Sequence, residues 1–320
     1  MNNAESNSGT AAATYHIDTD MGVDDSLALM LADALLPDIS AISCVFGNVP
    51  VKTAIRNALL VRELLGRRDS WQVVAGADRP ANRDQLNALD VHGDDGLGGA
   101  TNKIDQTILN EIQNAKIARL EDVGGKRTGK GPITIVGLGP ATNIPKLVEQ
   151  YGKANIEKIV LMAGSFFDVG NIRPNAEFNA FVDPEAFEDT IDIGVPVTVV
   201  PLDVCRKVQL SRAVMQNYGR RSKAPIAKLL MDAHMSYMDF YRKVEGIDGC
   251  FPHDAVTVLA AIRPEHFFSL RGVVTIDNAG QTTFKRDNKS HIEVFTGGNL
   301  KWVRETINAL LLERDVPVPI

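Results

Sequence analysis

Short apolar runs alternate with stretches of helical periodicity through the first 200 residues of this 320-residue chain. The runs that resemble buried strands are residues 39–46, 71–74, 133–136, 159–162 and 197–200, and the helical stretches include residues 51–65, 141–151 and 184–191. Strand and helix repeated in this order predict a mostly parallel central sheet flanked by helices on both faces. The expected fold class is therefore α/β, with a ligand site at the carboxyl ends of the strands.

The remainder of the chain predicts more helix and then an antiparallel segment. A long helical region is expected over residues 211–243, with Pro225 marking a break between two helices. Residues 268–277 and 281–285 predict a β-hairpin, which a strand at 291–295 and a helix at 300–312 follow. Because no internal repeat or low-complexity linker divides the sequence, we expect one domain over residues 14–320 and a disordered polar tail over residues 1–13.

Charge and cysteine content exclude several classes of protein. The formal net charge is -6 and no stripe of Lys and Arg occurs, so a nucleic-acid backbone is not an expected partner. No stretch reaches the roughly 18 uninterrupted apolar residues that span a membrane. Cys44, Cys205 and Cys250 are widely spaced, which argues against a disulfide framework or a zinc site and favours a reducing, cytoplasmic location.

The run from Asp18 to Asp25 places four carboxylates within eight residues, between an apolar strand and a helical pattern. Like charges at this density repel one another, and a hard cation such as Ca²⁺ or Mg²⁺ offsets that repulsion through oxygen coordination. Either Asp24 or Asp25 can cap the following helix, but a cap requires a single side-chain oxygen. Four aspartates exceed that structural need, so the run predicts a metal site.

Further polar clusters follow other predicted strands. Asn48 comes after Gly47 at the end of one run, where its amide can bind a hydroxyl. The glycine-rich segment 91–99 lacks the Lys-Ser/Thr pair of a phosphate-binding loop, so it is expected to form a mobile lid over a pocket. Residues 171–179 supply three amides and a carboxylate, as a site for a polyhydroxylated ligand does. The pair His253-Asp254 offers an acid or base beside a carboxylate.

These segments together resemble the inosine-uridine-preferring nucleoside hydrolases. The shared motifs occur in one order between Asp18 and Asp254: Asp-Thr-Asp-Met-Gly-Val-Asp-Asp, Gly-Asn, Val-His-Gly-Asp-Asp-Gly-Leu-Gly-Gly, Gly-Leu-Gly-Pro-Ala-Thr-Asn, Ala-Glu-Phe-Asn and His-Asp-Ala. The resemblance implies a single Rossmann-like domain and Ca²⁺-dependent hydrolysis of the N-glycosidic bond of ribonucleosides, giving ribose and a free base. Family members usually have Pro where Met21 stands, a departure that is expected to loosen the turn without removing a ligand.

The resemblance also implies a set of metal ligands. Ca²⁺ is expected to bind the carboxylates of Asp20, Asp25 and Asp254 and the backbone carbonyl of Leu138, while water and ribose hydroxyls complete its coordination. Expelling a base from ribose creates an oxocarbenium-like centre that an activated water must attack. Since Ca²⁺ lowers the pKa of water only weakly, a carboxylate has to accept the proton, and Asp20 is the candidate for this general base.

Ribose is expected to be held by several polar side chains at once. These are Asp24, Asn48, Asn171, Glu177, Asn179 and Asp254, and Met162 is expected to pack against the sugar. Such a site excludes 2′-deoxy substrates, because a missing hydroxyl leaves buried polar groups unpaired.

The base pocket resembles that of the histidine-containing subgroup of the family. His253 is the expected general acid toward the leaving base, and His92 is expected to line the base pocket. Phe167 is either a stacking partner of the base or an aromatic residue of the core. These residues are compatible with uridine, cytidine, inosine or a broad range of bases, and similar proteins are homodimers or homotetramers, so a homo-oligomer is expected.

Two alternative functions are compatible with parts of this sequence. Asp18-Thr19-Asp20 imitates the nucleophile motif of haloacid-dehalogenase-like phosphohydrolases, but that chemistry normally requires Gly-Thr after the second aspartate, where this chain has Met21-Gly22. A catalytically inactive Ca²⁺-dependent nucleoside or ribose-binding protein would keep the same pocket. The presence of both Asp20 and His253 argues against it, because binding alone requires neither a base nor an acid.

Overall fold

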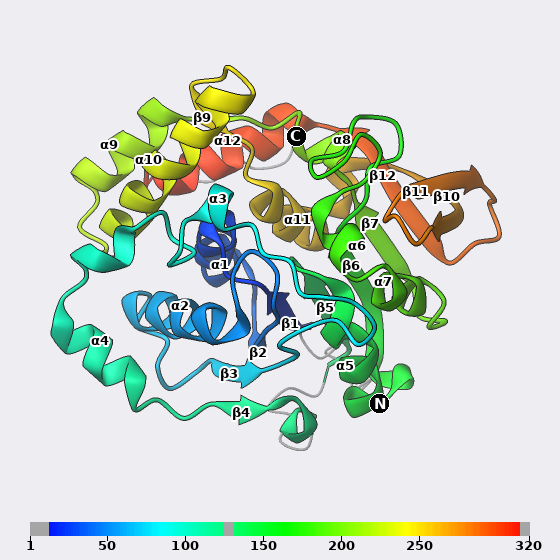
Figure 1. Cartoon of the computed structure of the whole chain (residues 1–320), viewed down its shortest axis with the longest axis horizontal. Helices are drawn as coiled ribbons and strands as arrows, with labels where there is room; N and C mark the ends of the chain where they lie inside the picture. Colours follow the sequence, from blue (N-terminus) through cyan, green and yellow to red (C-terminus); the bar gives the residue numbers. More distant parts are fainter. Residues whose placement is uncertain (1–12, 125–130, 314–320) are drawn as a thin grey trace, which may run out of the picture.

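The computed structural model describes residues 13–124 and 131–313. Within these residues the central sheet contains ten strands in the order β11-β10-β12-β7-β6-β5-β1-β2-β3-β4 (Figure 1). The eight strands from β12 to β4 pair in parallel, and β10 and β11 add an antiparallel edge. The predicted tail over residues 1–13 lies outside the described residues except for Ala13.

The strands of this sheet are two to ten residues long. In chain order they are β1 (Thr14–Thr19), β2 (Ile39–Cys44), β3 (Gln72–Ala75), β4 (Ala118–Arg119), β5 (Ile133–Gly137), β6 (Ile156–Met162), β7 (Val197–Val200), β10 (Phe267–Ile276), β11 (Thr282–Arg286) and β12 (Ile292–Gly298). A separate two-stranded sheet pairs β8 (Leu210–Ser211) with β9 (Gly249–Cys250).

Helices connect most of the parallel strands. The α-helices are α1 (Val23–Leu35), α2 (Val51–Leu64), α3 (Leu89–His92), α4 (Gln106–Gln113), α5 (Ile144–Tyr151), α6 (Phe178–Val182), α7 (Pro184–Ile191), α8 (Leu202–Cys205), α9 (Arg212–Arg221), α10 (Pro225–Val244), α11 (His253–Ile262) and α12 (Leu300–Leu311). Short 3-10 helices are η1 (Ala100–Lys103), η2 (Leu120–Asp122), η3 (Ala141–Asn143), η4 (Lys153–Asn155) and η5 (Pro264–His266).

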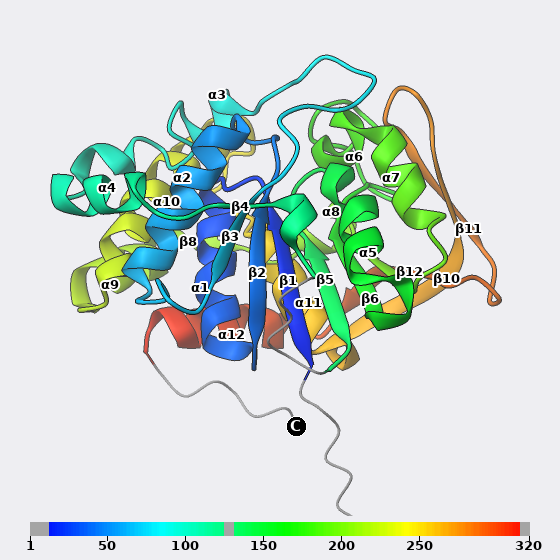
Figure 2. The ribbon, with the colours of Figure 1, turned by 90° about the horizontal axis from the view of Figure 1, so that it is seen from below.

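Two apolar cores cover the two faces of the sheet. Along β5, Ile135 belongs to the core shared with α5 and α7, whereas the next residue, Val136, belongs to the core shared with α1, α2, α10, α11 and α12. This alternation follows from the two-residue period of a strand. The two groups of helices lie on opposite sides of the strands (Figures 1 and 2). The prediction of a mostly parallel sheet flanked by helices is confirmed.

The strand order reverses direction at β1. From β1 the chain continues to β2 and β3 on one side, and it returns at β5 on the other side. The connections therefore diverge from the carboxyl ends of β1 and β5 and leave a crevice there, which is where open α/β sheets bind ligands. The residues that follow these two ends are Asp20 and Leu138.

Most elements predicted from the sequence are present, with small changes at their ends. Pro225 does separate two helices, α9 and α10, and the hairpin across residues 278–280 joins β10 to β11. The stretch 141–151, expected as one helix, consists of η3 followed by α5. No helix in the described part of the chain is both long and apolar enough to cross a bilayer.

Candidate active site and metal centre

The turn between β1 and α1 is built around Asp25. The Gly22 N–H donates to one oxygen of the Asp25 carboxylate at 2.7 Å, and the Thr19 hydroxyl donates to the other. The Met21 N–H in turn donates to the Thr19 hydroxyl oxygen at 3.1 Å. Asp25 therefore does stabilise the start of α1, as the capping interpretation expected, and the same bonds fix Asp24 beside it in the first turn.

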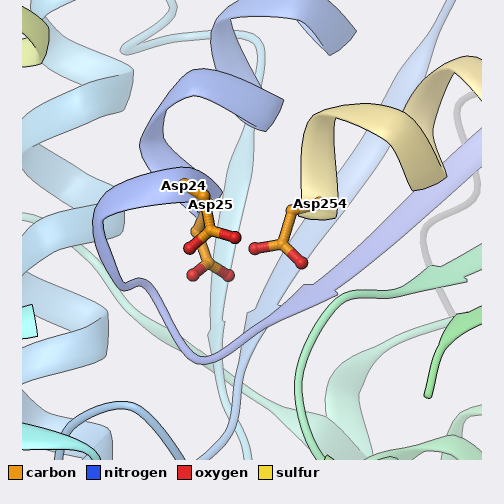
Figure 3. Close-up of side chains that lie close together, drawn as sticks. All are labelled: Asp24, Asp25 and Asp254. Carbon is orange, nitrogen blue, oxygen red and sulfur yellow. The ribbon is translucent and has the colours of Figure 1, made fainter. Parts of the chain in front are cut away.

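Asp254 lies in the first turn of a second helix, α11, opposite the turn between β1 and α1. Figure 3 shows the carboxylates of Asp24, Asp25 and Asp254 facing one another, and each offers an oxygen within 4.8 Å of the others. All three residues are buried. Burial, reinforced by the charge of Asp25, raises the pKa of Asp24 to about 8, and burial with the charge of Asp24 raises the pKa of Asp254. Three buried carboxylates at this separation form a site that a cation would stabilise.

Asp20 lies next to this group and is held by Asn48. Its carboxylate accepts from the Asn48 backbone N–H at 2.7 Å and from the Asn48 side-chain amide at 3.0 Å. Gly47 has a φ of +154°, and a Cβ there would stand 2.1 Å from an Asp20 carboxylate oxygen, so the backbone approaches Asp20 as only glycine allows. Burial, with the charge of Asp25, raises the pKa of Asp20.

The predicted metal ligands are thus only partly brought together. Asp25 and Asp254 belong to the three-carboxylate group, and the third member is Asp24 in place of Asp20. The Leu138 carbonyl lines the nearby cavity and accepts from the Asn179 amide at 2.7 Å. The assignment of Asp20 and Leu138 as ligands therefore stays a prediction.

Asp18 is not a member of the three-carboxylate group. It accepts from the Ser43 hydroxyl and, at 2.8 Å, from the Asn143 amide. Ser43 also bonds His16 Nε2 at 2.8 Å, and His16 Nδ1 bonds the Tyr151 hydroxyl at 2.8 Å. The first aspartate of the run therefore belongs to a buried hydrogen-bond chain under the strand ends, consistent with its exclusion from the predicted ligands.

A cavity of about 250 Å³ opens above the carboxylate group. Ten of the residues predicted for the site line it: Asp24, Asn48, His92, Leu138, Met162, Asn171, Glu177, Asn179, His253 and Asp254. None of the lining residues within the described ranges is Lys or Arg. A cavity with buried carboxylates and no cationic side chain fits a metal-assisted site for a neutral, polyhydroxylated ligand.

The side-chain amide of Asn179, which lines the cavity, already uses both of its N–H donors. Asn179 Nδ2 donates to the carbonyls of Leu138 at 2.7 Å and Met162 at 2.9 Å, which leaves its oxygen free to accept from a hydroxyl. Glu177 accepts from the backbone N–H groups of Gly164, Asn179 and Ala180 and so caps α6. Burial nevertheless raises the pKa of Glu177 to about 7 against the effect of these donors.

His92 is fixed as a neutral ring with a defined tautomer. The Val23 N–H donates to His92 Nδ1 at 3.0 Å, so the ring proton is on Nε2. Burial, with the neighbouring His234, lowers the pKa of His92 to about 3. In the glycine-rich segment around it, the backbone N–H groups of Leu97, Gly99 and Thr101 already donate to the Asp95 carboxylate. These bonds order the segment internally, and its motion as a lid stays a prediction.

Two tyrosines of α10 complete the cavity and were not predicted. Tyr241 bonds His253 Nε2 at 3.0 Å through its hydroxyl, and Tyr237 stacks on His92 with ring centroids 5.2 Å apart. Burial lowers the pKa of His253 to about 3, and its Nδ1 is buried without a partner among the described residues. Spacing of i and i+4 on one helix was the available signal, but aromatic pairs at that spacing are more common in helix cores.

Phe167 is not part of the cavity. Its side chain is 61% exposed and packs edge-on against Phe284, with centroids 6.1 Å apart. The loop that carries it is held by Asp203, which accepts from the backbone N–H groups of Phe166 and Phe167. The structure therefore places Phe167 neither in the lining of the cavity nor in the core.

Comparison with known proteins points in the same direction as the geometry. The family model described as inosine-uridine preferring nucleoside hydrolase matches residues 15–306. Uridine nucleosidase 1 of Arabidopsis thaliana is 33% identical over 270 residues, which cover 82% of this chain and 78% of that protein. The pyrimidine-specific ribonucleoside hydrolase RihA of Klebsiella pneumoniae (strain 342) is 32% identical over 271 residues, covering 83% and 85%.

Solved structures agree in fold across nearly the whole chain. A plant nucleoside hydrolase superposes with a TM-score of 0.75 at 28% identity, covering 94% of this chain and 98% of its own. A purine-preferring ribonucleoside hydrolase from Gardnerella vaginalis superposes with a TM-score of 0.76 at 24% identity, covering 94% and 99%, and shows the shared fold.

Proposed function

Because this chain belongs to the inosine-uridine preferring nucleoside hydrolase family and is a nucleoside hydrolase, we propose that it cleaves ribonucleosides to ribose and free base with Ca²⁺ as cofactor. One observation carries the proposal: three buried carboxylates converge beneath a cavity that also contains two neutral histidines, His92 and His253. This arrangement supplies a cation site for the sugar and proton donors for the base in one pocket.

The residues fit a hard cation. Asp24, Asp25 and Asp254 are buried within 4.8 Å of one another, and no cationic side chain of the described residues lines the cavity. Carboxylate and carbonyl oxygens are the ligands that Ca²⁺ takes in proteins. We assign Asp20, Asp25, Asp254 and the Leu138 carbonyl to its coordination. When bound, Ca²⁺ polarises a water molecule and the ribose hydroxyls.

Asp20 is the proposed general base. The water oxygen forms a bond to C1′ as the N-glycosidic bond breaks, the bonding pair passes to the base, and Asp20 takes the proton that the water loses. The two Asn48 donors hold the Asp20 carboxylate in place for this transfer. Asp24, Asn48, Asn171, Glu177, Asn179 and Asp254 hold the ribose hydroxyls, and Met162 packs against the sugar.

His253 is the proposed general acid for the leaving base. Burial raises the pKa of the Tyr241 hydroxyl, so in the resting site this group keeps its proton and donates a hydrogen bond to His253 Nε2 at 3.0 Å. The ring N–H is then on Nδ1, which has no other partner among the described residues. This proton passes to the departing base while Nε2 takes the Tyr241 hydroxyl proton, so the ring stays neutral; before the next turnover Asp20 loses its proton to solvent and Tyr241 regains one. His92 offers its Nε2–H to the same base, since its Nδ1 already accepts from Val23.

The test is release of ribose from uridine, cytidine, inosine, adenosine and guanosine, before and after chelation of calcium. We expect chelator-sensitive release, and uridine is the first substrate to try because the curated relatives are named for uridine and pyrimidine nucleosides. No release from any nucleoside by the calcium-loaded protein would favour the inactive binding protein instead. Release of ribose that survives chelation would overturn the calcium assignment.

We also propose a cellular location and an assembly state. Cys44, Cys205 and Cys250 are buried free thiols, which supports a reducing, cytoplasmic location. A homodimer or homotetramer is proposed from the family resemblance, and sedimentation of the purified protein would distinguish these from a monomer.

A further inference from the structure

We propose that Asn57, a residue of α2 outside the cavity, is a positioning residue that holds the aspartate turn and the His92 segment at a fixed separation. The inference rests on the proposed function, because Asn57 acts through the position of His92 relative to the carboxylates. Asn57 has no exposed surface and does not line the cavity. Its role follows from the two backbone carbonyls to which it donates, because they belong to two different parts of the site.

The Asn57 amide bridges two backbone carbonyls that are far apart in sequence. Nδ2 donates to the Met21 carbonyl at 3.2 Å and to the Asp95 carbonyl at 2.8 Å. The orientation of the amide is fixed, since Oδ1 accepts from Arg56 Nε at 3.2 Å and from Arg56 Nη2 at 3.0 Å. Arg56 Nη2 also donates to the Asp95 carbonyl, at 2.9 Å. Asn57 is thus saturated by interactions that serve the backbone of the site.

The first carbonyl belongs to a strained turn. Met21 is buried and has a φ of +46°, in the left-handed region that residues other than glycine seldom adopt. Such a conformation persists only when surrounding bonds hold it. The Thr19 hydroxyl holds the Met21 N–H and Asn57 holds the Met21 carbonyl. The residue before this turn is Asp20, whose carboxylate is held independently by the two Asn48 donors, so the Asn57 bond acts mainly on the separation between the turn and the His92 segment.

The second carbonyl belongs to a rigid loop. The Asp95 carboxylate closes residues 95–101 by accepting from three backbone N–H groups, and the Gly98 N–H donates to the His92 carbonyl at 2.8 Å. Fixing Asp95 therefore fixes the segment that carries His92. Gly96 has a φ of +75°, and a Cβ there would lie 2.8 Å from Asn57 Nδ2, so the loop packs directly on the amide.

A second link joins the same two segments on the cavity side. The Val23 N–H donates to His92 Nδ1 at 3.0 Å. One bond alone would act as a hinge, whereas the Val23–His92 bond and the Asn57 bridge together fix the separation and orientation of the two segments. Without Asn57, two carbonyls would lose a buried donor and His92 would lose its defined position relative to the carboxylates.

The experiment compares Asn57→Leu and Asn57→Asp with Asn308→Leu, a control at a partly buried asparagine of α12 whose Oδ1 has no partner among the described residues. Each is assayed with uridine and with p-nitrophenyl riboside, whose leaving group needs no proton. We expect both Asn57 variants to lose at least about tenfold in kcat for uridine, a part of the roughly 10²- to 10⁴-fold that a general acid contributes, while kcat for p-nitrophenyl riboside changes by less than about threefold. Asn308→Leu should leave kcat unchanged for both substrates. A parallel loss on both substrates would overturn the positioning role.

Two further measurements separate this inference from the proposed activity. In a double-mutant cycle, Asn57→Leu combined with His92→Ala should lose little more than His92→Ala alone, because the two changes remove the same function. Hydrogen exchange provides a readout without substrate: amides of residues 21–25 and 92–99 should exchange faster in Asn57→Leu and not in Asn308→Leu. If the wild type releases no ribose, the proposed function fails while exchange still tests the bridge. Unchanged exchange in both segments would refute the bridge itself.

Discussion

The Val23 backbone N–H donates a hydrogen bond to His92 Nδ1 at 3.0 Å, across 69 residues of sequence. Val23 is the first residue of α1, so its N–H has no partner within the helix. The imidazole supplies that partner, and in doing so it keeps its only proton on Nε2. One hydrogen bond thus completes a helix start and sets the protonation of a residue that lines the cavity.

Replacing His92 by Asn or by Leu separates these two effects. Asn can still accept from Val23 but has no donor at the position of Nε2, whereas Leu supplies neither. We expect kcat/KM for uridine to fall in both variants by about 10²-fold, at the lower end of acid–base contributions. His92→Leu should also unfold more easily than His92→Asn, by about 1–3 kcal/mol, because it leaves a buried N–H unsatisfied. Urea titration of both variants checks this. Equal stabilities would show that the Val23 bond contributes nothing.

Asp20→Asn distinguishes an enzyme from a binding protein. Asn keeps the size of the side chain and one oxygen facing Asn48, but it cannot take a proton from water. Turnover of uridine is expected to fall by about 10²- to 10⁴-fold while ribose still binds, as measured by calorimetry. Asp18→Asn is the matched control, because that carboxylate bonds Ser43 and Asn143 and lies outside the carboxylate group. Turnover near that of the wild type in Asp20→Asn would mean that another group is the base.

Much of the site was predictable because its residues follow strand ends. In a parallel sheet, Asp20, Asn48, Leu138 and Met162 must lie at one edge once their strands are placed, and local sequence identifies those strands. His253 and Asp254 come from a helix start at the same edge, where the motif itself gives the signal.

The features that were missed depend on packing between distant segments. Tyr237 and Tyr241 have the spacing of an ordinary buried helix face, and only the position of α10 over the cavity distinguishes them. Asn57 is likewise one polar residue in a helical pattern, and its importance appears only when Met21 and Asp95 are seen on either side of it. Phe167 shows the reverse case, since adjacency to a motif did not bring its side chain to the cavity.

Removal of calcium should destabilise the folded protein through the carboxylate group. A ligand that binds only the folded state at about 100 times its Kd stabilises it by about 2.7 kcal/mol. We therefore expect a clear rise in the unfolding temperature when Ca²⁺ is added to chelated protein. The rise should shrink strongly in Asp254→Asn and persist in Asp18→Asn, which removes an equally buried charge elsewhere. An equal rise in both variants would place the cation away from Asp254.

His16, which does not line the cavity, should make the free energy of unfolding depend on pH. Burial lowers the pKa of His16 to about 3 from its ordinary 6.5, so the ring stays neutral between Ser43 and Tyr151 while the unfolded chain protonates it. The unfolded state then binds more protons between about pH 3 and pH 6.5, and stability falls as pH falls through that range. From about pH 7.5 to pH 5.5 this loss is about 1.4 kcal/mol.

His16→Gln cannot take up that proton, so the difference in unfolding free energy between wild type and variant should narrow by this amount over the same interval. Urea titrations at both pH values measure the difference, with His291→Gln, at a surface histidine, as the control. A difference that stays constant with pH would mean that His16 takes up a proton in the folded state as readily as in the unfolded chain.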